Sequence, residues 1–84
     1  MQLRGLKPNT IVIHVTTQTL YRITCVNIGC DNIVSHVTAA DARGNAITID
    51  RYHSPGDGTF HPRYFKRTRI RPKDIWDLLG RTIR

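Results

Sequence analysis

The most constraining feature of the sequence is an alternating run of residues at Thr10–Thr16. Odd-numbered and even-numbered residues of this run lie on opposite sides of an extended chain, and all of them except His14 are β-branched. β-Branched side chains favour strands because their restricted χ1 angles suit a pleated backbone. The run therefore predicts a β-strand near the start of the chain.

Four further segments resemble strands, at 20–28, 33–40, 46–52 and 64–71. Gly, Asp and Asn residues between these segments favour tight turns. The segment 53–62 contains two Pro and two Gly, so an exposed loop is predicted there. Pro72 suits the first turn of a helix, which predicts a short helical turn at about 73–79.

A chain of 84 residues has room for one hydrophobic core, so a single domain spanning 1–84 is expected. Five short strands joined mainly by tight turns are typical of small closed sheets. The predicted fold class is mainly β, as a small five-stranded SH3-like or OB-like barrel with a short C-terminal helix. The chain ends are expected to be loose.

A short pattern near the N-terminus combines Lys7-Pro8-x-Thr10 with His14 and Leu20-Tyr21-Arg22-Ile23. This pattern resembles that of small SH3-like barrel proteins of bacteria and their phages, in which a first hairpin ends in a similar Tyr-Arg-hydrophobic stretch. The resemblance covers the first quarter of the chain, with a partial counterpart at Ile70-Arg71-Pro72. It implies a barrel fold and carries no functional residue over to this sequence.

Positive charge is concentrated in the C-terminal third of the chain. The net charge is +7, and nine of the thirteen Lys and Arg residues lie at or beyond Arg51. Most are Arg, whose planar guanidinium offers paired donors to phosphate or carboxylate. The densest part has no acidic residue and contains Arg63, Lys66, Arg67, Arg69, Arg71 and Lys73. This segment predicts a surface that binds a polyanion.

The alternation in 64–71 predicts how these charges are presented. Tyr64, Thr68 and Ile70 are expected to face the core, while Arg67, Arg69 and Arg71 form a row on the opposite side. Alternate residues of a strand lie about 6.6–6.8 Å apart, a spacing suited to successive phosphates of a nucleic acid. The alternative is an edge strand whose charges prevent aggregation between sheets.

Two residues of the preceding loop complete the predicted binding surface, Phe60 and His61. Exposed aromatic rings between cations stack on the bases of single strands, and Phe60 is the favoured candidate. The alternative is that a core this small needs its large aromatic residues for packing.

Two functions fit this surface. The first is a non-catalytic module that binds DNA or RNA by contacting the phosphate backbone. The second is a small phage- or mobile-element-encoded regulator that binds an acidic surface of a host protein, with Trp76 as a possible anchor. The oligomeric state stays open.

Catalysis and metal binding are not predicted. Cys25 lies inside a predicted strand rather than on the tight knuckle that zinc sites favour, and buried Cys commonly acts as a small hydrophobe. His53 and His61 flank Asp57, but a Pro- and Gly-rich loop does not hold catalytic geometry. The sequence therefore predicts a non-enzymatic protein without a metal or other cofactor.

No long apolar segment or signal peptide is recognisable in the sequence. The expected location is the cytoplasm, with no membrane partner.

Overall fold

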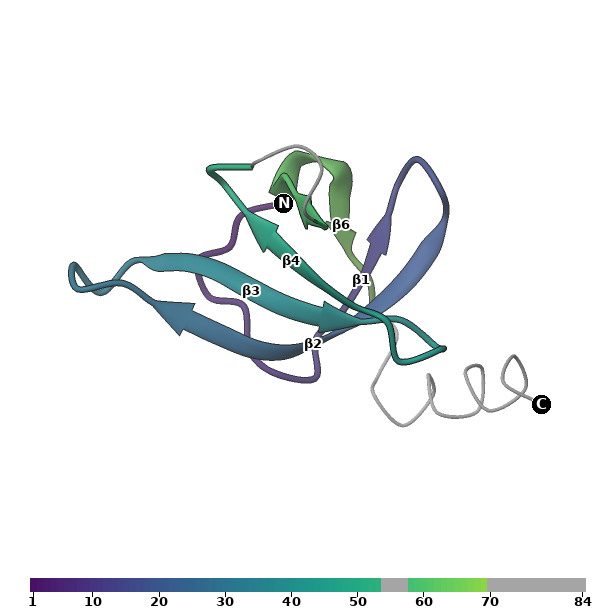
Figure 1. Ribbon diagram of the computed structural model, residues 1–84, viewed down its shortest axis with the longest axis horizontal. Helices are drawn as coiled ribbons and strands as arrows, with labels where there is room; N and C mark the ends of the chain where they lie inside the picture. The colour runs from purple at the N-terminus through teal and green to yellow at the C-terminus, as the bar shows by residue number, and fades with distance from the viewer. Residues whose placement is uncertain (54–57, 70–84) are drawn as a thin grey trace.

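The computed structural model describes residues 1–53 and 58–69, and it shows one curled β-sheet (Figure 1). The sheet order is β5-β4-β3-β2-β1-β6, and every neighbouring pair is antiparallel except the parallel pair β4 and β5. The strands are β1 (Ile11–His14), β2 (Thr19–Ile28), β3 (Val34–Ala40), β4 (Ala46–Asp50), β5 (Thr59–Phe60) and β6 (Phe65–Arg67). The mainly β fold class is confirmed, while the predicted helix at 73–79 lies outside the described residues.

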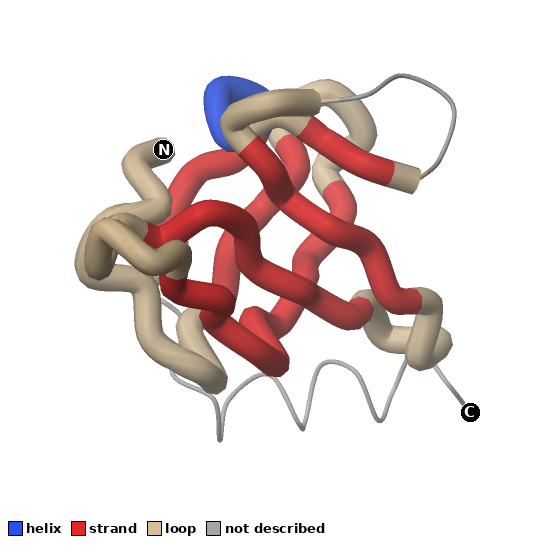
Figure 2. The backbone as a smooth tube through the Cα atoms, turned by 60° about the vertical axis from the view of Figure 1, so that its left-hand side comes forward, coloured by secondary structure: helices blue, strands red, loops and turns tan. Residues whose placement is uncertain are grey.

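Curling brings the two edges of the sheet close together, which gives the half-barrel visible in Figure 2. The edge strands β5 and β6 are joined by a single 3₁₀ turn, η1 (Pro62–Tyr64). The rings of Phe60 in β5 and Phe65 in β6 lie 6.0 Å apart in a T-shaped arrangement. Aromatic packing thus connects the two edges across the interior.

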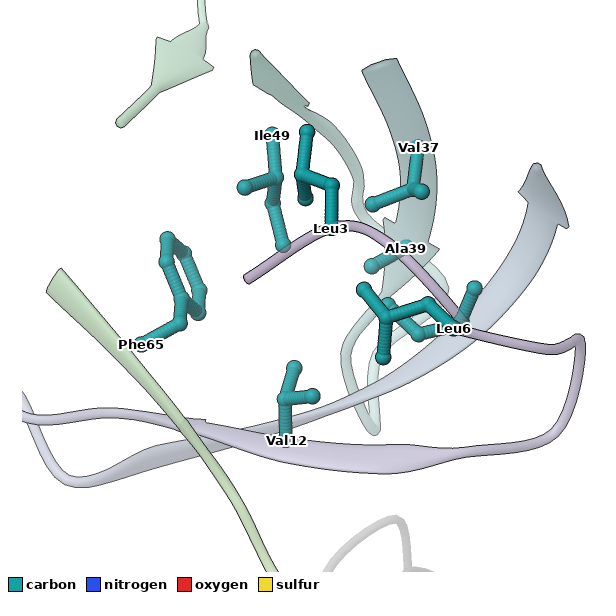
Figure 3. Packing of buried hydrophobic residues seen from close by; sticks show 8 residues of the cluster. Leu3, Leu6, Val12, Val37, Ala39, Ile49 and Phe65 are labelled. Atoms are coloured by element: carbon teal, nitrogen blue, oxygen red, sulfur yellow. The ribbon is translucent and has the colours of Figure 1, made fainter. Parts of the chain in front are cut away.

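The core lies on the concave face of the sheet (Figure 3). In β3 and β4 the buried residues alternate with more exposed ones, as the sequence predicts, and Val37, Ala39 and Ile49 are fully buried. The described core cluster consists of Leu3, Leu6, Val12, Ile23, Val37, Ala39, Ile49 and Phe65.

Residues 1–8 close part of the concave face, which corrects the expectation of a loose N-terminal end. Leu3 and Leu6 are 7% and 5% exposed, and both point toward the sheet residues of the core in Figure 3. Between them Gly5 has a φ of +79°, a left-handed conformation that glycine adopts without steric cost. The backbone N–H of Leu6 donates to the carbonyl of Leu3 at 3.1 Å. This turn directs both leucines into the core.

An aromatic cluster fills one end of the core around Phe65. Its ring makes T-shaped contacts with His14 at 5.0 Å and Tyr21 at 5.9 Å, in addition to that with Phe60. Burial, followed by the nearby Asp41 carboxylate, raises the pKa of Tyr21 above its usual value. The Tyr21 phenol therefore keeps its proton to a higher pH than an exposed tyrosine does.

The prediction of five strands is wrong, because the described residues already form a sheet of six. The extra strand lies in the segment 53–62, which was expected to be an exposed loop. Thr48 pairs with Thr59 and Ile49 pairs with Phe60, so β5 extends the sheet beyond β4. Pro62 is buried at the start of η1. Burial of Phe60 and Pro62 against the core outweighs the local turn-forming composition.

The predicted orientation of the last strand is also wrong. Tyr64 ends η1 and is only half-buried, while Phe65 begins β6 and is 1% exposed. Strand β6 is shorter than the predicted 64–71, and Arg67 pairs directly with Val12 of the core. Directly paired residues share one face of a sheet. Arg67 therefore projects from the concave face rather than the opposite one.

Packing of residues 1–8 generates a first prediction. Replacement Leu6→Ala removes buried methyl groups, so it should lower the free energy of unfolding by about 2–4 kcal/mol in urea denaturation. The neighbouring Lys7→Ala, at an exposed position, should change it by less than about 0.5 kcal/mol. Equal stability of the two variants would show that the N-terminal segment is not part of the core.

Candidate anion-binding surface

A cleft of about 800 Å³ opens between the N-terminal segment and the end of the sheet where β3 begins and β4 ends. Two exposed Arg residues line it, Arg4 in the N-terminal segment and Arg51 directly after β4. The half-buried His61 also lines it. The complete lining is 1–5, 32–34, Arg51, His61 and Pro62.

A smaller hollow of about 430 Å³ continues this surface along β6. Met1 and Gln2 line both spaces, so the two are adjacent across the N-terminal segment. Lys66 and Arg67 line the smaller one, and both are exposed. We call the Lys and Arg residues of the two spaces the basic band, which consists of Arg4, Arg51, Lys66 and Arg67.

No carboxylate among the described residues lines either space. The three described acidic residues instead accept backbone N–H groups within their own turns. Asp31, Asp41 and Asp50 accept from residues two positions further along at 3.2, 2.9 and 2.7 Å, respectively. These carboxylates stabilise their own turns and do not line the basic band. The positive potential of the band is therefore available to attract an external anion.

Arg67 has a structural task within the basic band. Its Nη2 atom donates to the carbonyl of Arg4 at 2.9 Å and to the carbonyl of Gln2 at 3.4 Å. The amino group of Met1 also donates to the carbonyl of Pro62, at 3.3 Å. These bonds fix the N-terminal segment along β6 and η1. Arg67 thereby positions the segment that carries Arg4.

His61 and Arg63 flank the band at η1. The His61 Nδ1 atom accepts the backbone N–H of Arg63 at 3.0 Å, which caps the 3₁₀ turn. The Arg63 guanidinium lies 5.0 Å from the ring centre of Tyr64 and donates to its hydroxyl at 3.0 Å. Arg63 is thus held beside the band by its own neighbour.

Of the residues predicted to bind, the structure brings together Arg63, Lys66, Arg67 and His61, and it leaves Arg69 exposed just after β6. Phe60 is half-buried and packs on His14 and Phe65, which fits the packing alternative. The remaining predicted binding residues, Arg71, Lys73 and Trp76, lie outside the described residues.

Sequence reasoning missed two cations of the band, Arg4 and Arg51, because both are isolated in the sequence. Tyr52 was one of the aromatic residues near the positive charges in the sequence, but Phe60 was preferred for base contact; Tyr52 is 71% exposed. The Arg51 guanidinium carbon lies 5.0 Å from the centre of the Tyr52 ring. The Arg-Tyr dipeptide at 51–52 was the available signal, since such pairs support cation–π contacts.

A separate hollow of about 410 Å³ lies near the aromatic cluster and is lined by His14, His53, Phe60 and Tyr64 among others. His14 Nδ1 accepts the backbone N–H of Thr17 at 3.2 Å, so this imidazole supports the turn after β1. No Lys or Arg is among the described residues of this lining. The candidate anion site is therefore the basic band.

No family model, curated protein or solved structure matches this chain. In the part of the chain that the structure describes, no helix is long and apolar enough to cross a membrane.

The role of Arg67 generates a second prediction. Replacement Arg67→Ala removes the bonds to the Gln2 and Arg4 carbonyls, so the free energy of unfolding should fall by about 1–2 kcal/mol. Lys66→Ala, one residue earlier and exposed, should change it by less than about 0.5 kcal/mol. Thermal and urea unfolding measure both, and a stability loss confined to Lys66→Ala would contradict this assignment.

Proposed function

We propose that this protein is a non-catalytic nucleic-acid-binding module whose basic band contacts the phosphate backbone. The observation that carries the proposal is the separation of charges on the molecule. Cations from three distant parts of the chain line one continuous surface, whereas each described carboxylate is bound within its own turn. A surface of this kind attracts a polyanion and releases its counterions on binding.

The geometry of the band suits an extended ligand more than a small one. Its two spaces meet at Met1 and Gln2. Together they form an elongated surface beside the N-terminal segment, with Arg51 in the larger space and Lys66 in the smaller one. Guanidinium groups bind phosphate oxygens through paired donors. A backbone with regularly spaced phosphates is able to meet several of these cations at once.

The absence of a catalytic role is part of the same proposal. His61, the one titratable imidazole on the described lining of the cleft, is engaged through Nδ1 as the cap of η1. Positioning and charge neutralisation are sufficient for backbone binding, which requires no nucleophile or general base.

We also propose that the half-barrel is of the SH3-like type. Support comes from four successive antiparallel strands, β1 to β4, and from a last strand that returns beside β1 after a single 3₁₀ turn. The resemblance of the first hairpin to SH3-like barrel proteins of bacteria and phages agrees with this arrangement.

A host protein with an acidic surface is the second candidate partner, as expected of a phage- or mobile-element-encoded regulator. The observation that favours it is apolar exposure beside the cleft. Ile33 lines the cleft and is 47% exposed, and Ile28, at the end of β2, is 63% exposed. Apolar side chains next to cations are common in protein interfaces.

The proposed function generates a third prediction, tested by salt titration of binding to a fluorescent oligonucleotide. Each phosphate contact contributes about 0.7 to the slope of log K against log salt for a single strand. The double replacement of Arg4 and Arg51 by Gln should therefore reduce the slope by about 1.4. The control is Arg43→Gln, an exposed cation in the β3–β4 turn that does not line the band.

No measurable affinity at low salt would overturn nucleic-acid binding. Capture of a protein from a nuclease-treated bacterial lysate, lost in the Arg4 and Arg51 double variant, would then support the second candidate.

A further inference from the structure

Tyr52 differs from the other described aromatic residues in its exposure. Its side chain is 71% exposed, whereas Phe65 is 1% exposed and the rings of Tyr21, Phe60 and Tyr64 are partly buried against the core. Among the described Phe and Tyr residues, folding therefore leaves the Tyr52 ring most open to water. A ring in this position is available for contact with a ligand.

The backbone at Tyr52 is held in place. Its N–H donates to the Asp50 carboxylate at 2.7 Å, which closes a tight turn directly after β4. This bond attaches the residue to the end of a paired strand, because Asp50 lies opposite His36 in β3. The ring is consequently presented from a defined position, and little backbone entropy is lost when it binds.

The ring is also paired with a cation of the basic band. Arg51 stacks near it, with the guanidinium carbon 5.0 Å from the ring centre, and Arg51 lines the cleft together with Arg4. The 71% exposure shows that this stacking leaves most of the ring open. The exposed Tyr52 ring therefore lies beside a cation that lines the cleft.

A duplex has no free base face to offer such a ring, because its bases stack on one another. Proteins that bind single strands combine cations for the backbone with aromatic rings on which unpaired bases stack. Arg51 and Tyr52 supply one of each at adjacent positions.

We infer that the basic band takes a single-stranded nucleic acid, with an unpaired base stacked on Tyr52 and the adjoining phosphates held by Arg51 and Arg4. The inference rests on the proposed function and narrows its ligand to single strands. It assigns base contact to Tyr52 in place of Phe60, whose ring packs in the core.

The test compares probes with the same phosphates but different bases. Anisotropy titrations at low salt use a labelled oligothymidylate, an abasic oligonucleotide of equal length, and a duplex. The wild-type protein is expected to bind oligothymidylate more tightly than either other probe. Tyr52→Ala should weaken oligothymidylate binding about 5- to 150-fold, the range measured for loss of one base stack, and leave the abasic probe unaffected.

Two matched variants complete the design. Tyr52→Phe keeps the ring and should bind oligothymidylate within about twofold of wild type, since stacking is the interaction at issue. Val15→Ala removes another exposed apolar side chain, which lines neither space of the basic band, and should have no effect. Circular dichroism and thermal unfolding confirm that each variant is folded.

The possible failures are distinct. Equal wild-type affinity for oligothymidylate and the abasic probe would overturn base stacking while the proposed function stands. An equal loss on both probes in Tyr52→Ala would overturn it as well, because the effect would then be structural or electrostatic. Tighter binding of the duplex than of oligothymidylate would overturn the inference alone, and binding of none of the three probes would overturn the proposed function together with it.

Discussion

The packing of the N-terminal segment into the concave face of the sheet is the contact on which the rest of the structure depends. Leu3 and Leu6 supply two of the buried side chains of a small core. A domain of this length has a limited interior, so each buried leucine contributes a large share of its stability. The same segment forms one wall of the cleft. The packing of this one segment therefore both closes the core and completes the basic band.

Arg67 connects these two roles. Its bonds to the carbonyls of Gln2 and Arg4 hold the segment against β6, and its own charge belongs to the band that the segment completes. Cations of the band come from the N-terminal segment, from the residue after β4 and from β6. Curling of the sheet brings these distant positions to one surface. The clustering of Lys and Arg in the sequence therefore explains only some of the cations on this surface, and folding brings in the others.

The sequence alone was sufficient to predict the regular part of the sheet. Alternation in 33–40 and 46–52 correctly indicated strands, and Ile49 is buried as that alternation requires. The same reasoning failed where the pairing of β2 and β3 is irregular. Ile23 pairs with Ala39 and Cys25 with Thr38, so an extra residue shifts the register, and Cys25 is exposed instead of sharing the buried side of Ile23.

The binding surface was less predictable than the sheet. Strand β6 begins at Phe65, after the 3₁₀ turn, and Arg67 pairs with the core residue Val12. Arg67 therefore lies on the same side as Phe65, the reverse of the face predicted for Arg67. Arg4 and Arg51 join the band only through tertiary packing. Local patterns contain no information on such contacts, whereas the overall excess of positive charge was evident from composition.

The most direct test of nucleic-acid binding by the basic band is amide chemical-shift mapping by NMR during titration with a short single-stranded oligonucleotide. Binding by the basic band should shift the amide signals of Arg4, Arg51, Tyr52 and Lys66 most, and leave those of the β3–β4 turn around Arg43 unchanged. Shifts centred on that turn, or a spectrum that does not change at low salt, would contradict it.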